Sequence, residues 1–382
     1  MSYVKNLSLI NINPDKISNL IKSNIANDYQ KYGRQNISYL GFNLDEMILS
    51  CHFGNIPCNI AKDFAWHYSY DFVNCYTFNS GRDQNENSVP LKYIGEDEPN
   101  KSLQLEIFIG IDKIQSEFIL NSGLNIVIHG HNLERVLPGK GKQIPSGYDI
   151  SFGVSMLNRT RLDSPYNNCI KNVKSQSSFS SYFFKAIFNV LNMTIYSQNV
   201  CFEICLQDYI KNACGCLDGS LPNIYLDTNI TICKTLNILD CVSSARVNYY
   251  NSALSSECFQ CPSECDILDY NVVFTSESRF SSFYKEYIWN NLNLSKLFPS
   301  SSKTPDLSNS VVKLNIFYDD LKVTYLHQTP LLTTKDLVSK VGGIVGLFLG
   351  MTLMEIPKLI ELFIDNLILL VEFNKPQKVN FI

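Results

Sequence analysis

The residues best suited to handle ions lie near the carboxyl end of this sequence. Gly342, Gly346 and Gly350 recur at every fourth position within the apolar stretch 341–354. Glycines with this spacing share one side of a helix and let helices approach closely in a membrane. The charges that follow fall within an arc of about 120° on a helix; they are Glu355, Lys358, Glu361 and Asp365. Such a stripe is costly in lipid unless it faces water or other helices, so the segment predicts a helix that borders an aqueous path shared by several copies.

A buried helix of a water-soluble protein is the alternative for this segment. The uncharged run 341–354 has 14 residues, whereas a helix needs about 20 to cross the hydrocarbon layer. We also expect Pro357 to bend or break the helix just after the glycines, because proline removes a backbone hydrogen bond. Broken helix at membrane depth is tolerated where it lines a cavity. Both interpretations stay open on these residues alone.

The other groups that could do chemistry are weaker candidates. His129 and His131 could chelate a metal, but no acidic or cysteine cluster lies near them in the sequence. Segment 138–147, PGKGKQIPSG, does not fit the phosphate-binding Gly-x4-Gly-Lys-Ser/Thr pattern and predicts a surface turn. No Ser/His/Asp or Cys/His arrangement stands out. We therefore predict no enzyme, no metal site and no cofactor.

The 13 cysteines indicate an oxidising compartment. Ten of them lie between Cys169 and Cys265, where CFQCPSEC leaves a zinc site as the rival interpretation. Six glycosylation sequons favour disulfides outside the cytoplasm, because zinc sites do not explain them. The predicted glycosylation sites are Asn6, Asn36, Asn158, Asn192, Asn229 and Asn293. The net charge of -4 indicates no nucleic acid partner.

Apolar patterns predict the elements that carry these residues. Strand-like runs separated by Gly, Pro and Asn predict an antiparallel sheet; they lie at 73–83, 102–111, 124–131, 149–157 and 311–326. Helical spacing at 180–193 and 199–214 predicts a small helical subdomain stapled by disulfides, and 300–310 predicts a loop. No signal peptide opens the chain. An extracellular body therefore requires a segment before residue 1 or targeting by the 341 segment itself.

Several motifs in their order resemble the degenerin / epithelial sodium channel / acid-sensing ion channel family. They are LININP (9–14), DEMILSCHFGNIPC (45–58), CYTFNSG (75–81), the cysteine order CFEIC…CGC…C…C…CFQCPSEC, and GGIVGLFLGMT near the carboxyl end. The resemblance covers nearly the whole chain. It implies a trimer whose subunits each have two membrane helices flanking an extracellular region of palm, β-ball, finger, knuckle and thumb. We therefore expect an α+β membrane protein in the plasma membrane, with the bulk of the chain extracellular.

The same resemblance divides the chain. It implies an antiparallel-sheet palm and β-ball with a short finger at 1–168, a Cys-rich helical thumb at 169–265, a return to the palm at 266–338, one transmembrane pore helix at 339–372 and a cytoplasmic tail at 373–382. The first membrane helix and its His-Gly motif would precede residue 1, so we expect an N-terminally truncated member. The short finger implies that the acid-sensing pocket is reduced or absent.

Residue roles also follow from the resemblance. The implied disulfides are Cys51–Cys58, Cys169–Cys265, Cys201–Cys261, Cys205–Cys258, Cys214–Cys241 and Cys216–Cys233, which leaves Cys75 as a free buried thiol. The selectivity filter, Gly-Ala-Ser or a close variant, corresponds to Gly350, Met351 and Thr352, where small residues let carbonyl oxygens replace ion hydration. The expected pore and gate residues are Lys340, Gly342, Gly343, Gly346, Glu355, Lys358 and Glu361.

The leading functional hypothesis is a subunit of a trimeric channel for sodium or other monovalent cations, opened by movements of thumb and palm. Its partners would be two further channel subunits and the lipid bilayer. The alternative is a non-conducting, membrane-anchored modulatory or binding subunit, because Lys340 and Lys358 introduce positive charge and Met351 is bulky for a filter. A secreted disulfide-rich protein is a third possibility.

Overall fold

The computed structural model describes residues 13–95, 102–110, 123–130, 141–171, 174, 181–191, 193, 195–226, 229–253, 258, 260–291, 310–350 and 355–373. The chain separates into two compact units, Met1–His327 and Gln328–Ile382. The boundary between extracellular region and membrane segment that the resemblance implies, after residue 338, stays a prediction. It lies inside a helix that begins at Thr334.

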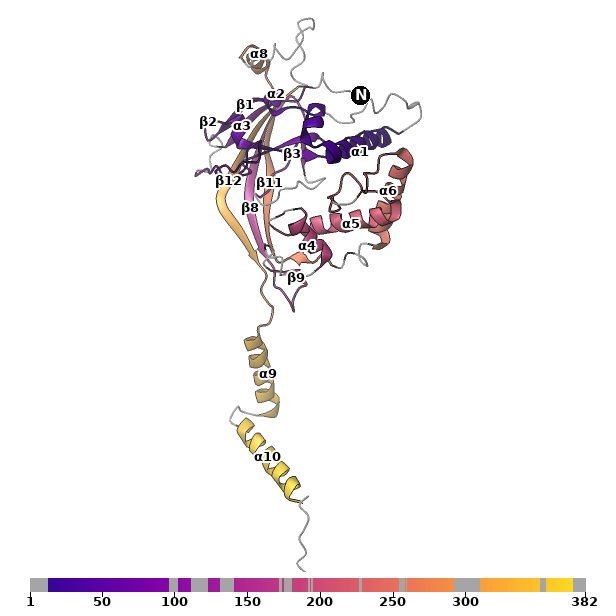
Figure 1. The fold of residues 1–382 in the computed structure, drawn as a ribbon. Helices are drawn as coiled ribbons and strands as arrows, with labels where there is room; N and C mark the ends of the chain where they lie inside the picture. The colour runs from indigo at the N-terminus through magenta and orange to yellow at the C-terminus, as the bar shows by residue number, and fades with distance from the viewer. Residues whose placement is uncertain are drawn as a thin grey trace, which may run out of the picture. The chain divides into compact units, whose positions relative to one another are not determined.

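A six-stranded sheet forms the centre of the first unit (Figure 1). Its order is β11 (Asp266–Arg279), β8 (Tyr148–Thr160), β12 (Val311–His327), β5 (Leu103–Phe108), β1 (Ile48–Phe53) and β2 (Ile56–Pro57). Alternating apolar residues bury one face, which includes Ile150, Phe152 and Leu314. The predicted strands at 102–111, 149–157 and 311–326 correspond to β5, β8 and β12.

The sheet is not purely antiparallel as predicted, because β12 pairs with β8 in parallel. Strand β11 runs back along β8 with an antiparallel register from Asp266 opposite Thr160 to Arg279 opposite Tyr148. After β11 has reversed the chain, β12 must run in the direction of β8. It then inserts on the free side of β8, where it also pairs antiparallel with β5.

Shorter paired strands surround this sheet. A hairpin joins β3 (Phe64–Ser69) to β4 (Val73–Phe78), and a second joins β6 (Leu124–Ile126) to β7 (Lys142–Ile144). Strands β9 (Cys169–Ile170) and β10 (Ser263–Glu264) pair in parallel. The strand predicted at 124–131 is thus shorter than expected, and the predicted loop 300–310 lies outside the described residues except for Ser310.

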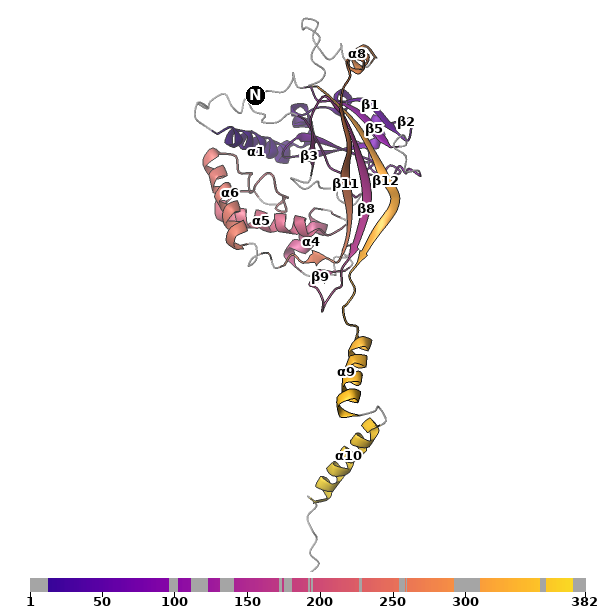
Figure 2. The same cartoon turned by 180° about the vertical axis from the view of Figure 1, so that it is seen from behind.

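Three helices form the disulfide-rich region 169–265, which we call the thumb. They are α4 (Tyr182–Asn189), α5 (Gln198–Cys214) and α6 (Leu236–Asn248), the last continued by one π-helical turn (Tyr249–Ala253). They lie beyond the β11 edge of the sheet in both views (Figures 1 and 2). Their apolar sides pack on one another around Phe184, Ile204 and Ile210, so this region has its own core.

Helix α1 (Pro14–Tyr32) is not among the elements predicted from the apolar patterns. The signals were present in the sequence: Asn13 caps the helix through the backbone N–H of Asp15, and Pro14 stands at the first helical position. Ile17, Leu20 and Ala26 recur with helical spacing on its buried side. This helix lies within 1–168, the range that the resemblance assigns to palm, β-ball and short finger.

The remaining helices of the first unit are brief. They are η2 (Arg34–Asn36), η3 (Ser38–Leu40), α2 (Leu44–Met47), α3 (Ile60–Asp63) and α8 (Ser282–Asn291). Ile288 of α8 and Phe280, two residues before this helix, pack with Phe108 and Val311 at one end of the sheet. This apolar contact closes the end of the sheet core.

Candidate functional site

The glycine-bearing segment forms two helices, α9 (Thr334–Leu349) and α10 (Glu355–Phe373), instead of one helix over 339–372. Helix α9 ends where Gly350 adopts a left-handed conformation with φ 62° and ψ 14°. Residues with a Cβ disfavour this conformation, so the break belongs to the glycine. Met351 and Thr352 of the expected filter lie outside the described residues, and Gly350 borders them.

The prediction that Pro357 breaks the helix is wrong. Pro357 lies in the first turn of α10, where a backbone N–H has no helical acceptor to lose. The predicted interruption therefore exists, but it starts at Gly350, seven positions earlier in the sequence. Among the helices in the described ranges, none is both long and apolar enough to cross a membrane alone.

The start of α9 is closed by a capping box. The Thr333 hydroxyl accepts from the Asp336 backbone N–H at 3.2 Å, and the Asp336 carboxylate accepts from the Thr333 backbone N–H at 2.9 Å. The Thr333 hydroxyl also donates to the Asp336 carboxylate at 2.7 Å. These contacts satisfy helix donors that would otherwise lack partners, which fixes where α9 begins.

The small residues of α9 are not required by packing within this chain. A Cβ built at Gly342 or Gly343 meets no atom within 4 Å. Apolar side chains on one side of the same helix are also exposed, with Leu337 at 53%, Ile344 at 58% and Phe348 at 79%. Contiguous exposed apolar surface of this kind marks a contact with another chain or with lipid.

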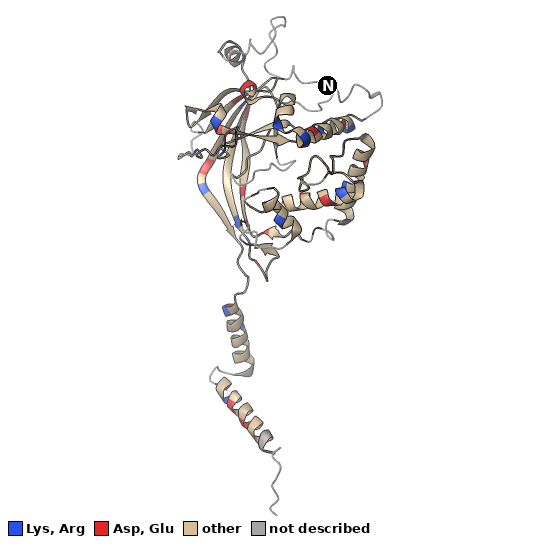
Figure 3. Cartoon of the chain, in the orientation of Figure 1, with Lys and Arg blue, Asp and Glu red and all other residues tan. Residues whose placement is uncertain are grey.

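Charged residues lie on both helices (Figure 3). Helix α9 carries Lys340, and α10 carries Glu355, Lys358 and Glu361, all expected pore residues. A shallow groove on α10 is lined by Pro357, Ile360, Glu361, Ile364 and Asp365. The carboxylates of Glu361 and Asp365 therefore border an open groove whose lining is mostly apolar.

The structure pairs the same twelve cysteines as the resemblance implied. The bonds are Cys51–Cys58, Cys169–Cys265, Cys201–Cys261, Cys205–Cys258, Cys214–Cys241 and Cys216–Cys233. Cys75 on β4 is free, and it is partly buried, less than expected. Burial raises the pKa of its thiol to about 11. The thiol is therefore protonated and weakly nucleophilic at neutral pH.

The histidine and lysine-glycine motifs do not assemble a site. The His129 ring N–H donates to the Gly130 carbonyl at 2.9 Å, and His131 lies outside the described residues. Burial, with a smaller effect of nearby His129, lowers the pKa of His67 to about 4. In the described part of the chain, no three His, Cys, Asp or Glu side chains could hold a metal ion together. The turn predicted at 138–147 contains strand β7.

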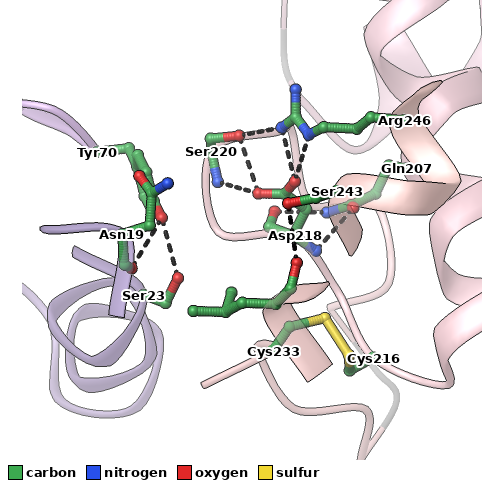
Figure 4. A network of polar contacts seen from close by, with 11 residues as sticks. Asn19, Ser23, Tyr70, Gln207, Cys216, Asp218, Ser220, Cys233, Ser243 and Arg246 are labelled. Atoms are coloured by element: carbon green, nitrogen blue, oxygen red, sulfur yellow. Dashed lines mark hydrogen bonds and ion pairs between the residues drawn. A yellow bond between two sulfur atoms is a disulfide. The ribbon is translucent and has the colours of Figure 1, made fainter. Parts of the chain in front are cut away.

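A buried polar network positions the thumb loop that faces α1 (Figure 4). The Asp218 carboxylate accepts from Arg246 Nε at 2.9 Å and from Arg246 Nη2 at 2.6 Å, and its other oxygen accepts from Ser220. Fully buried Gln207 brackets the same loop, donating to the Asp218 carbonyl at 3.0 Å and accepting from its N–H at 2.9 Å. These bonds hold the loop after Cys216 in one conformation.

Comparison with known proteins decides the family. The model of the amiloride-sensitive sodium channel family matches residues 2–362. The chain belongs to the amiloride-sensitive sodium channel family. It is 25% identical to the degenerin-like protein unc-105 of Caenorhabditis elegans over 338 residues, which cover 85% of this chain and 35% of that protein.

The chain is also similar to two channels from other animals. The chain is 25% identical to the FMRFamide-activated amiloride-sensitive sodium channel of Cornu aspersum, covering 88% of this chain and 63% of that protein. It is 25% identical to the bile acid-sensitive ion channel of Homo sapiens, covering 85% of this chain and 59% of that protein. The chain thus spans between about a third and two thirds of the length of these relatives.

Family membership confirms the resemblance deduced from the motifs, and it agrees with the sheets and disulfide-linked helices of the fold. The sequence did not reveal the network around Asp218, because Gln207, Asp218 and Arg246 are separated in the chain and match no motif. Two predicted glycosylation sites of this family member, Asn36 and Asn229, are exposed, whereas Asn158 is partly buried on β8 between β11 and β12. Asn6, Asn192 and Asn293 lie outside the described residues.

Proposed function

We propose that the chain is one subunit of a trimeric channel for sodium or other monovalent cations. The observation that supports this most is the match of residues 2–362 to a sodium channel family. In this proposal, α9 and α10 together form a broken membrane span. The filter is formed at Gly350, Met351 and Thr352, between the two helices.

Helix length supports a span made of two pieces. The 16 residues of α9 extend about 24 Å and the 19 residues of α10 about 28 Å. A hydrocarbon core of about 30 Å exceeds each helix, while the two in series are long enough. A non-helical break at membrane depth is tolerated where protein or water covers it. Three copies around an axis would supply that cover at Gly350.

The faces of α9 support an orientation for this span. At about 100° per residue, Lys335, Ser339, Gly342, Gly343 and Gly346 share an arc of about 100°. Leu337, Val341 and Phe348 lie on the opposite side. In the proposal the glycine face lies toward the other subunits and the aqueous path, and the apolar face lies toward lipid.

The charges of α10 support cation passage only in part. Three copies of Glu361 and Asp365 would surround the axis with carboxylates, which favour cations in a pore. Lys358 lies in the same stripe of α10 and would oppose it. Lys340 lies about 60° outside the glycine arc of α9 and would add positive charge beside the path. We therefore propose cation conduction with a selectivity weaker than a purely acidic pore would give.

Cysteine substitution on the two faces of α9 tests this function. A cationic, water-soluble thiol reagent should reduce the current of a channel carrying Gly346→Cys. Val341→Cys, from the opposite face, is the matched control and should be unaffected. Equal modification of the two variants, or no current in any ionic condition with or without a related subunit, would refute the proposal.

A non-conducting modulatory subunit is the second candidate, and Lys340 together with Lys358 is the observation that favours it. Positive rings repel cations, and such a chain would act through a conducting partner. Expression alone and with a complete relative separates the two candidates. A modulator changes current only when the partner is present.

A further inference from the structure

The central sheet continues beyond its core as a three-stranded end. Strand β12 pairs with β5 only from Val311 to Ile316, whereas it pairs with β8 as far as His327. Strand β11 pairs with β8 along the whole of β8. Strands β11, β8 and β12 therefore extend past β5, as both views show (Figures 1 and 2). The two faces of this three-stranded end differ in character.

One face has the charges expected at a protein surface. Arg159 of β8 and Asp269 of β11 form an ion pair at 2.8 Å, and both side chains are more than 40% exposed. Successive residues of a strand point to opposite faces, so Asn158 and Thr160 lie on the other face. By the same alternation, that face continues the side on which Phe152 is buried in the sheet core. Asn158 therefore stands on the extension of the core face.

The cover of the core face reaches the row next to Asn158. Residues paired across strands share a face, so Tyr270, Met156 and Val323 form one row. A Cβ built on Gly130 would lie 3.5 Å from the Tyr270 ring, so the chain passes close to this row. The row that follows along β8 is more open.

This following row is apolar at both ends and carries a glycosylation sequon in the middle. Asn158 pairs with Leu268 on one side and with Tyr325 on the other. The exposed fraction of the Leu268 side is 49%, and that of Tyr325 is 58%. In the described part of the chain, no hydrogen bond holds the Asn158 amide, which is partly exposed. We call Leu268, Asn158 and Tyr325 the sequon row.

A sugar on Asn158 fits the sequon row chemically. An N-linked glycan begins with N-acetylglucosamine, which has a face lined by C–H groups. The negative face of an aromatic ring attracts such hydrogens, so the Tyr325 ring offers a platform. Leu268 and Tyr325 also gain from cover, because burial removes apolar surface from water. The linkage is covalent, so the sugar is always close to the row.

We propose that Asn158 carries an N-linked glycan whose first sugar packs on Tyr325 and Leu268, so that the chain's own glycan covers the open end of the core face. The Tyr325 ring is already restrained, because it stacks on the His327 ring with centroids 5.9 Å apart and planes 3° apart. The inference goes beyond conduction. It requires only that the first unit, Met1–His327, enters the secretory pathway.

The covalent step needs a donor of the secretory pathway, a lipid-linked oligosaccharyl diphosphate. The Asn158 amide nitrogen bonds to C1 of the first sugar while the bond from C1 to the diphosphate oxygen breaks. The amide loses one proton, and the lipid diphosphate leaves. Thr160 completes the sequon that this transfer requires.

Site-resolved deglycosylation of the full-length protein, purified from animal cells in detergent, tests this inference. Peptide-N-glycosidase F hydrolyses the bond between sugar and asparagine and leaves aspartate, which peptide mass spectrometry detects at each site. We expect Asn158 to carry a glycan that is released from the native protein at least about tenfold more slowly than those at exposed Asn36 and Asn229. After denaturation the three sites should be released at similar rates.

Two substitutions test the contact with the aromatic ring. Tyr325→Ala should speed native release at Asn158 about threefold or more, because the sugar loses its platform. Tyr325→Phe keeps the ring and should keep the protection. Tyr182→Ala in the thumb is the matched control, since Tyr182 is also 58% exposed. If Tyr325→Ala fails to fold, Leu268→Ala tests the other end of the row and should also speed release.

Two results would overturn the inference. One is an unmodified Asn158; glycans at Asn36 and Asn229 would then show that the unit enters the secretory pathway and that this inference alone has failed. The other is native release at Asn158 that is equally fast in Tyr325→Ala and Tyr182→Ala. Neither result depends on whether the protein passes ions.

Discussion

Replacing Arg246 with methionine should destabilise the first unit, Met1–His327, through the Asp218 carboxylate. The carboxylate is 9% exposed, and it receives two of its hydrogen bonds from the guanidinium, which is 33% exposed. Breaking a buried ion pair by removing one partner costs about 3–5 kcal/mol. Water reaches one third of the guanidinium, so we expect a smaller loss of about 2–3 kcal/mol. For a large folded unit this lowers the melting temperature by roughly 4–12 °C.

The assay is the loss of the size-exclusion peak after heating the detergent-solubilised protein. Arg159→Met is the matched control, because Arg159 pairs with Asp269 at 2.8 Å while both side chains are more than 40% exposed. This control should shift the midpoint by no more than about 2 °C. Combining Arg246→Met with Asp218→Asn should recover part of the loss, because the buried charge is then gone. Equal midpoints for Arg246→Met and Arg159→Met would refute the reasoning.

Three further predictions concern other parts of the chain. Burial raises the pKa of Cys75 to about 11, so its thiol is protonated below that pH. Iodoacetamide should therefore label Cys75 negligibly at pH 7.5 and increasingly above pH 10. Ready labelling at neutral pH would contradict this prediction. Gly350→Ala forces a Cβ into a left-handed conformation at a cost of about 1–2 kcal/mol, so the current should fall. Val341→Ala, on the opposite face of α9 from the glycines, is the control and should change the current little. Asn36→Gln and Asn229→Gln should each remove one glycan, seen as a gel shift that enzymatic deglycosylation abolishes; an unchanged mobility would show that the site is not used.

Patterns local in the sequence predicted much of this fold. Alternating residues located β5, β8 and β12, and helical spacing located α4 and α5, because each pattern reports the burial of one face of one element. The helix break was also predicted, but at Pro357. The first turn of a helix tolerates proline, so Pro357 does not interrupt α10. Gly350, in a left-handed conformation, ends α9. Composition alone does not say which of two helix-breaking residues acts.

By itself, the sequence determined the family, the disulfide framework by resemblance, and a carboxyl-terminal segment that combines glycines with a charged stripe. The tertiary structure decided the parallel pairing of β8 with β12, the placement of α1, and the contact of Ala26 with Gly219. Residues far apart along the chain meet only after intervening elements have reversed its direction. Their spacing carries no periodic signal, so neither the Ala26–Gly219 contact nor the Asp218 network is visible before the fold is known.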